Sequence, residues 1–278
     1  MTICVAVKVH DCLVFAADSA LSLVLDGATE NVYAHGNKVF NLVKGLPVCA
    51  MFCGMGNIGY SSISSLAKDL RRQLTVPPEA GGIDRAAYTI AEITERAKAL
   101  IWDSAYCALP EKPAGDHSFE FFVGGYSAGS QLSEVWKFSI INGELLGPAQ
   151  QFPGEARAFV IWAGQPEALN RLILGYSQYL PGALLEAGVP EDQLPGVMAK
   201  LPPLVATPLA EDPMPTGDAI ELADFLVDVT KRYVHFMRGA DTVGGDTDIA
   251  TVTRHEGFKW IRRKHHYPRE INLETDHV

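Results

Sequence analysis

The 278-residue chain has only five cysteines and no long hydrophobic run, and each shortage excludes a class of protein. The cysteines are odd in number and lie mostly within apolar segments, which indicates reduced, buried thiols and not a disulfide framework. No apolar segment approaches the roughly 18 residues that a membrane span requires. The first residues also lack the basic and apolar regions of a secretory signal. We therefore expect a cytoplasmic protein that does not associate with a membrane.

Basic residues are scarce as well: 23 lysines and arginines stand against 33 aspartates and glutamates, a formal net charge of -10. Nucleic acid is therefore not expected as a partner, because phosphate binding needs a concentrated basic surface. The one basic cluster, Arg262 to His266, is predicted to be a solvated strand end that leads into a polar tail at about 264–278. The histidines show no metal-ligand spacing beyond the adjacent His265 and His266, and no segment matches a phosphate-binding loop. Neither a metal nor a cofactor is expected.

Two short runs at the start of the chain, 2–9 and 12–18, are apolar at nearly every position and are joined at His10-Asp11. This pattern predicts two strands of a hairpin whose two faces are both covered. Further strands are predicted at 38–42, 46–53, 119–125, 133–140, 156–163, 247–254 and 258–263. Helices are predicted at 57–74, at 84–102 with Asp84 as N-cap, and at 218–238 with Asp218 and Glu221 as a capping box.

The segment 176–216 is dense in proline and glycine and is predicted to be an insertion with short helical pieces, which would act as a lid or an assembly contact. No linker of the kind that separates domains is present, so residues 1–278 are expected to form one domain. The order of elements favours an α+β fold in which two antiparallel sheets lie between outer helices, a four-layer αββα sandwich.

Thr2 is a candidate nucleophile. An N-terminal threonine supplies a hydroxyl that attacks a carbonyl and an α-amine that accepts the proton, so no histidine is needed. The amine is free only if Met1 is removed, and threonine is small enough for methionine aminopeptidase to act. The alternative is that Thr2 is simply a β-branched residue at the start of a strand.

Three further residues are candidates for the same site. Such a nucleophile needs a cation that lowers the pKa of the amine and a carboxylate that holds the cation, and Lys38 and Asp18 are of these types. The predicted hairpin brings Asp18 beside Thr2. Gly54, between a buried strand and a helix N-terminus, is placed to offer a backbone N–H to a developing oxyanion. A turn residue, a strand-edge charge and a simple glycine turn remain the alternatives for Asp18, Lys38 and Gly54. Cys4 and Cys53 lie close by in sequence, but no histidine that would stabilise a thiolate accompanies them.

Taken together, the stretch from Thr2 to Ser19, the strand that begins at Lys38 and the turn at Gly54 resemble the β-subunits of the proteasome and its bacterial relatives. These are N-terminal nucleophile (Ntn) hydrolases with an αββα fold, and VFAADS at 14–19 is the most specific match. The topology matches over about 1–175 and 217–263. The resemblance implies Thr2 as the nucleophile, Asp18 and Lys38 as its partners, and the Gly54 amide as the oxyanion donor.

The chain departs from the family pattern at two places. Gly164-Gln165-Pro166 stands where the family has a serine after a glycine, and residues 240–245 read ADTVGG where the family has DxxSGG. Asp241 and Thr242 would replace the missing acid and serine if the alignment slips by one residue. At these two places the sequence resembles two bacterial offshoots, Anbu and the betaproteobacterial proteasome homologue, more than it resembles HslV or the 20S core.

The same resemblance implies that Leu21, Phe40 and Phe52 line a pocket beside the nucleophile, which would favour small or medium uncharged side chains. The alternative is that all three are ordinary core residues. The function implied is that of a threonine peptidase acting on peptides or unfolded proteins within a homo-oligomeric ring or stacked rings. Whether an ATP-dependent unfoldase cooperates is left open. A small-molecule amidase and a catalytically silent assembly subunit of the same fold remain the alternatives.

Overall fold

A computed structural model describes residues 2–25, 28–153, 155–239 and 241–264. The first of its two large sheets has the strand order β12-β1-β2-β13-β14, and every neighbouring pair is antiparallel. Its strands are β1 (Ile3–Lys8), β2 (Cys12–Ala17), β12 (Phe159–Gly164), β13 (Asp248–Thr253) and β14 (Gly257–Arg262). The opening hairpin and the two closing strands, each predicted as strands, thus form the centre and one edge of a single sheet, an arrangement that the apolar runs did not predict.

The second large sheet has the order β11-β10-β9-β6-β5, again with antiparallel neighbours. Its strands are β5 (Val39–Asn41), β6 (Val48–Gly54), β9 (Ser118–Gly125), β10 (Glu134–Ile141) and β11 (Glu144–Gln150). Two small hairpins complete the strands: β3 (Leu21–Leu25) with β4 (Ala28–Tyr33), and β7 (Asn57–Ile58) with β8 (Ser61–Ser62).

Three longer helices cover the sheets, and short helices lie between β12 and the last long helix. The α-helices are α1 (Ile63–Thr75), α2 (Ile90–Lys98), α3 (Glu167–Leu169), α4 (Leu180–Glu186), α5 (Leu194–Lys200), α6 (Pro202–Val205) and α7 (Thr216–Phe236). A 3-10 turn is formed by Pro78–Ala80, and π-helical turns are formed by Ala99–Tyr106 and Asn170–Leu174. No helix in the described ranges is both long and apolar enough to cross a membrane.

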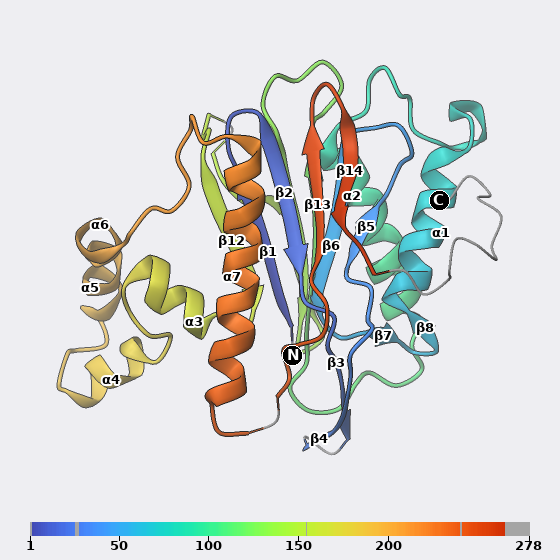
Figure 1. Ribbon diagram of the computed structural model, residues 1–278. Helices are drawn as coiled ribbons and strands as arrows, with labels where there is room; N and C mark the ends of the chain where they lie inside the picture. The colour runs from blue at the N-terminus through green and yellow to red at the C-terminus, as the bar shows by residue number, and fades with distance from the viewer. Residues whose placement is uncertain (1, 26–27, 154, 240, 265–278) are drawn as a thin grey trace.

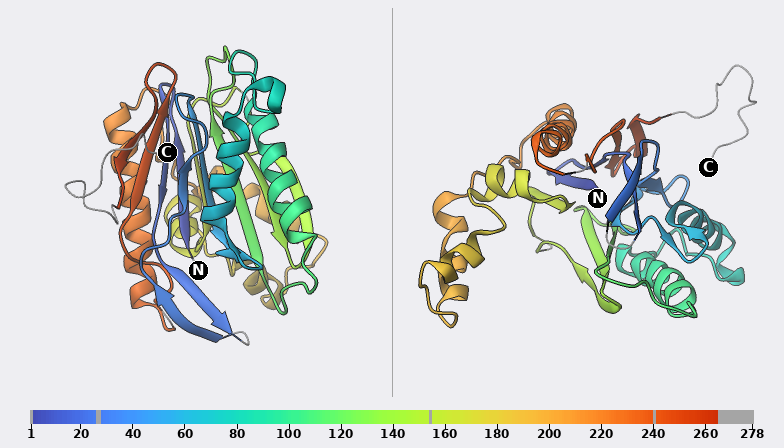
Figure 2. Two further views of the ribbon diagram at one scale, coloured as in Figure 1. Left: turned by 90° about the vertical axis from the view of Figure 1, so that its right-hand side faces the viewer. Right: turned by 90° about the horizontal axis from the view of Figure 1, so that it is seen from below.

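The two large sheets pack face to face, with α7 on the outer face of the first and with α1 and α2 on the outer face of the second (Figures 1 and 2). Alternate side chains of β1 point to opposite faces of the sheet and so belong to two different apolar clusters. Ile3, Val5 and Val7 belong to the apolar cluster beneath α7, whereas Cys4 and Ala6 belong to the cluster between the sheets. The predicted covering of both faces and the α+β class are therefore confirmed.

Several predicted boundaries are wrong because local hydrogen bonds compete with the apolar pattern. The helix predicted from 57 begins only at Ile63, since residues 57–62 form the β7–β8 hairpin and the Ser62 hydroxyl caps the Ser65 amide. Asp84 begins a turn in which its Oδ1 accepts the Ala86 amide, and Thr89 is the N-cap of α2. The hairpin β3–β4 and the strand β11 were not predicted.

The predicted capping box of the last long helix is also wrong. Helix α7 begins at Thr216 after Pro215, so Asp218 lies inside its first turn and makes no side-chain cap. A carboxylate in the first turn still favours the helix through its dipole. Residues 180–205 form α4, α5 and α6, which project from the sandwich (Figure 1) and contain no buried residue. Of the predicted tail at about 264–278, only Lys264 belongs to the described residues.

Candidate active site

Thr2 is buried at the end of the first sheet, directly before β1. Its carbonyl accepts a hydrogen bond from the Gln165 amide at 2.8 Å, just beyond the end of β12. Gly164 has φ +99°, and a Cβ there would lie 2.0 Å from the Thr2 carbonyl oxygen. Only glycine permits this approach of the two backbones. The Gly164-Gln165 segment, where the sequence departs from the family pattern, therefore holds Thr2 in place.

The β1–β2 hairpin brings Asp18 to the same end of the sheet, because Cys4 pairs with Ala17. The Asp18 carboxylate is fully buried. Its Oδ1 accepts the Ile3 amide at 3.0 Å, and its Oδ2 accepts the amides of Ala20 at 3.1 Å and Gly244 at 3.0 Å. The hairpin thus places the Asp18 carboxylate against the backbone of Ile3, the residue that follows Thr2, and the catalytic role of Asp18 stays a prediction.

Lys38 reaches Asp18 from the other sheet. Its Nζ lies 2.7 Å from Asp18 Oδ1, and both side chains are almost completely buried. Lys38 precedes β5, and its carbonyl accepts the Phe52 amide at 3.1 Å, which ties its backbone to β6. The ion pair therefore joins the two sheets beside Thr2. A buried pair of this kind is costly to desolvate, so it is weak evidence of stability and better evidence of a chemical role.

Gly54 ends β6 with φ +93°, and a Cβ there would lie 2.0 Å from the Ser118 carbonyl oxygen. The next amide, of Met55, donates to that oxygen at 2.9 Å. Leu21 lies at this end as well, because its Cδ2 is 3.3 Å from the position of a Cβ on Gly56. The turn needs glycine for its conformation, and its proposed role as an oxyanion donor remains a prediction.

The two predicted aromatic lining residues lie in the core. Phe40 and Phe52 stack with their ring centroids 6.0 Å apart, within the apolar cluster between the second sheet and helices α1 and α2. They are 6% and 2% exposed, so a substrate side chain could reach them only if this packing opened. Their role as pocket-lining residues, with Leu21, remains a prediction.

Asp241 does not lie in this cluster. Its carboxylate is exposed and lies 2.8 Å from His235 Nδ1 at the end of α7. The slip that would bring Asp241 to the site therefore does not occur; instead, the backbone of Gly244 contacts Asp18. Thr242 is buried, and its hydroxyl has no hydrogen-bond partner in the described part of the chain. Its supporting role stays a prediction.

A second buried ion pair, not predicted from the sequence, lies next to the first. Lys264 Nζ is 2.6 Å from Asp248 Oδ2 and also contacts the Ser19 hydroxyl, which in turn donates to the Asp246 carbonyl. The expectation that residue 264 belongs to a solvated strand end is wrong, because its side chain is only 4% exposed. The sequence carried no signal for this pair, because it depends on the register of β13, which places Asp248 opposite Ala17.

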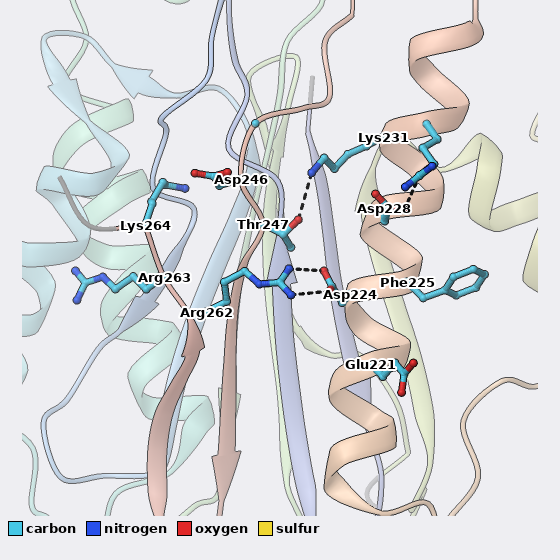
Figure 3. A pocket seen from close by; sticks show the side chains of 12 residues that line it. Glu221, Asp224, Phe225, Asp228, Lys231, Asp246, Thr247, Arg262, Arg263 and Lys264 are labelled. Carbon is cyan, nitrogen blue, oxygen red and sulfur yellow. Dashed lines mark hydrogen bonds and ion pairs between the residues drawn. The ribbon is translucent and has the colours of Figure 1, made fainter.

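The two arginines before Lys264 make different contacts. Arg262 makes a two-point ion pair with Asp224 on α7, at 2.8 Å for both contacts, and Arg263 lies over the Trp260 ring. A cavity of about 530 Å³ lies between α7 and the end of β14. In it, Arg262 contacts Asp224, whereas the side chain of Arg263 points away from α7 (Figure 3). The described residues hold no group of three or more His, Cys, Asp or Glu side chains arranged for a metal ion.

The thiols near the site are poor nucleophiles. Burial raises the pKa of Cys4 and of Cys53 above its ordinary value, although Lys38 opposes the change. Burial also raises the pKa of Cys12 and of Cys49. These thiols stay protonated at neutral pH, so the site does not support thiolate chemistry.

Treatment of the native protein with iodoacetamide at about pH 8 is expected to modify Cys107 alone, because it is the exposed cysteine and the other four are buried. Peptide mapping by mass spectrometry locates the adduct, and Cys107→Ser serves as the control that removes it. Rapid labelling of Cys4 or Cys53 in the folded protein would contradict this assignment and restore a thiol nucleophile.

Comparisons with known proteins show the fold. Neither protein-family models nor curated proteins match the chain. Among solved structures, the chain is similar to a mutant of Anbu from Hyphomicrobium sp. strain MC1, with a TM-score of 0.51 and 15% sequence identity, over 95% of this chain and 86% of that chain. The chain thus resembles in its fold Anbu, a bacterial proteasome-like homologue of the Ntn hydrolases.

Proposed function

We propose that this chain is a threonine-type Ntn hydrolase of the proteasome-like class, built on a four-layer αββα sandwich, that cleaves amide bonds in peptides or unfolded proteins. The observation that carries the proposal is the buried Asp18–Lys38 pair: its carboxylate accepts the amide of Ile3, the residue that follows Thr2. The fold shared with Anbu supports the class.

In the proposed reaction, removal of Met1, which lies outside the described residues, frees the α-amine of Thr2. The amine accepts the hydroxyl proton as the Thr2 oxygen attacks the carbonyl carbon of the substrate. The Lys38 ammonium favours the neutral, basic form of the amine, and Asp18 holds Lys38 in position. The Gly54 amide is proposed to stabilise the oxyanion.

Collapse of this tetrahedral species breaks the C–N bond. The amine of Thr2 returns the proton to the leaving nitrogen, and an ester on the Thr2 oxygen remains. Water then attacks the ester with the same amine as base, which releases the carboxylic acid and restores the threonine.

The proposal includes assembly of the chain into a ring or stacked rings in the cytoplasm. The helices α4 to α6 support it, because they contain no buried residue yet carry apolar side chains: Leu204 is 78% exposed, and the adjoining Tyr179 is 65% exposed. Short helices gain most of their stability from packing, so a second subunit is the expected cover.

A catalytically silent assembly subunit is the second candidate. One observation favours it: the carboxylate of Asp241, which was expected to support the N-terminal amine, lies at the surface against His235. The two candidates differ in whether Thr2 is processed and reactive.

Intact mass before and after exposure to a peptide epoxyketone tests the proposal. This reagent forms its ring adduct only with a free α-amine and the neighbouring hydroxyl. We expect a chain that lacks Met1 and gains one reagent mass. A chain that retains Met1 and gains no reagent mass would contradict the hydrolase proposal and favour the silent subunit. Turnover of small amides without turnover of peptides would indicate an amidase.

A further inference from the structure

We infer that Lys264 is a positioning residue of this site: its ammonium holds Ser19 and Asp248, and thereby keeps the backbone of Gly244 against the Asp18 carboxylate. The inference about the contacts stands on geometry alone, and its catalytic consequence rests on the proposed function. Lys264 follows β14 and is distant in sequence from every other residue of the cluster except Asp248 and its neighbours.

Lys264 donates two hydrogen bonds to the Asp248 carboxylate. Its backbone amide donates to Asp248 Oδ1 at 3.1 Å, and its Nζ donates to Oδ2 at 2.6 Å. Both side chains are buried, at 4% and 3% exposure. Hydrogen bonds between charged groups are the stronger class, and a backbone contact combined with a side-chain contact fixes the direction of the lysine.

The contact with Lys264 orients the hydroxyl of Ser19. The ammonium is only a donor, so the Ser19 oxygen must accept from it, and the hydroxyl proton is then directed to the Asp246 carbonyl. The Ser19 amide donates to the Gly244 carbonyl at 3.0 Å, and the Ser19 carbonyl accepts the Gly36 amide at 2.8 Å. All polar groups of Ser19 are therefore engaged, and two of its partners lie in the segment 244–246.

That segment contacts the proposed catalytic carboxylate directly. The Gly244 amide donates to Asp18 Oδ2 at 3.0 Å, opposite the oxygen that binds Lys38. Gly245 packs closely against two other segments of the chain: a Cβ on it would be 2.5 Å from the Ala34 carbonyl oxygen and 3.1 Å from Ser19 Cβ. Lys264 acts at one side of this tightly packed turn, and Asp18 lies at the other.

A merely stabilising ion pair would not need the Ser19 contact. Arg262, two residues earlier, pairs with Asp224 in the same cavity, and among the described residues its side chain makes no hydrogen bond to Ser19 or to the 244–246 turn. Lys264 alone of these three consecutive basic residues bridges β13 to the residue after Asp18. We therefore assign it a role in placing Asp18.

The test uses the full chain with a charge-neutral double variant, Lys264→Met with Asp248→Asn, which leaves no buried unpaired carboxylate and so preserves folding. Lys264→Arg is the conservative variant. Lys231→Met is the matched control, because Lys231 lines the same cavity but, within the described part of the chain, its ammonium has one hydrogen bond, to Thr247 at 3.4 Å. Two readouts are compared: hydrogen exchange of the peptide covering 241–248, and the kinetics of epoxyketone labelling.

In the double variant we expect hydrogen exchange across 241–248 to be about tenfold faster, because the segment loses the charged hydrogen bond that holds it closed. We also expect the maximal labelling rate to fall by about tenfold or more while the reagent concentration at half-maximal rate stays within about twofold. Lys264→Arg should recover part of the rate, and Lys231→Met should match wild type. Unchanged exchange in the double variant overturns the inference, as does a labelling rate equal to wild type. A wild-type chain that never reacts would refute the proposed function instead, and the exchange data would still decide the role of Lys264.

Discussion

Thr2→Ala is expected to abolish amide hydrolysis and the epoxyketone adduct, with a loss of at least about a thousandfold in the rate of amide cleavage. The change removes the hydroxyl that forms the ester, whereas the α-amine, the Asp18–Lys38 pair and the size that permits methionine removal are all kept. Initial rates on a fluorogenic peptide, together with the intact mass after reagent treatment, measure the effect.

Thr2→Ser is the matched control for this change. Serine keeps the hydroxyl and the small size, so the adduct should still form and part of the activity should remain. The thermal midpoint of the alanine variant should stay close to that of wild type, since only a hydroxyl and a methyl group are lost. An alanine variant that hydrolyses the peptide at the wild-type rate would exclude Thr2 as the nucleophile.

Asp18→Asn is expected to destabilise the protein by about 3–5 kcal/mol, because it leaves the Lys38 ammonium buried without its counter-charge. The asparagine amide would also face backbone N–H groups that now donate to a carboxylate, namely those of Ile3, Ala20 and Gly244. The free energy of unfolding from urea titration measures the effect.

Two further variants separate the charge effect from general damage. The double variant Asp18→Asn with Lys38→Met removes both charges and should recover a substantial part of the lost stability, since no unpaired charge remains. Asp228→Ala breaks an exposed ion pair with Arg232 on α7 and should cost less than about 1 kcal/mol. Equal losses for Asp18→Asn and Asp228→Ala would show that the buried pair has no special weight.

The strands that build the site could be predicted because their signal is local. The runs that became β1 and β2 are apolar at consecutive positions, and a hairpin of that length places its end beside its beginning. The approach of Asp18 to the residue after Thr2 follows from this one pairing. The α+β class likewise follows from the order of the strand and helix patterns.

Helix starts were less predictable, since the apolar pattern continues through residues that fold differently. Ile58 is buried as the helix pattern required, yet it lies in β7, because the turn at Gly59 and the cap at Ser62 delay the helix to Ile63. A side-chain cap outweighs the pattern over a few residues.

The sequence by itself determined the apolar strands, the two-sided burial of the first hairpin and the candidate roles of Thr2, Asp18 and Lys38. Only the tertiary structure decided that Lys264 is buried against Asp248 and Ser19, that Gly244 contacts Asp18, and that Asp241 does not. The reason is physical: periodicity reports which face of an element is covered, whereas a charged side chain is buried only where a partner from a distant segment offsets its desolvation. Such a pair becomes visible only when strand register brings the two segments together, as β13 does by placing Asp248 opposite Ala17.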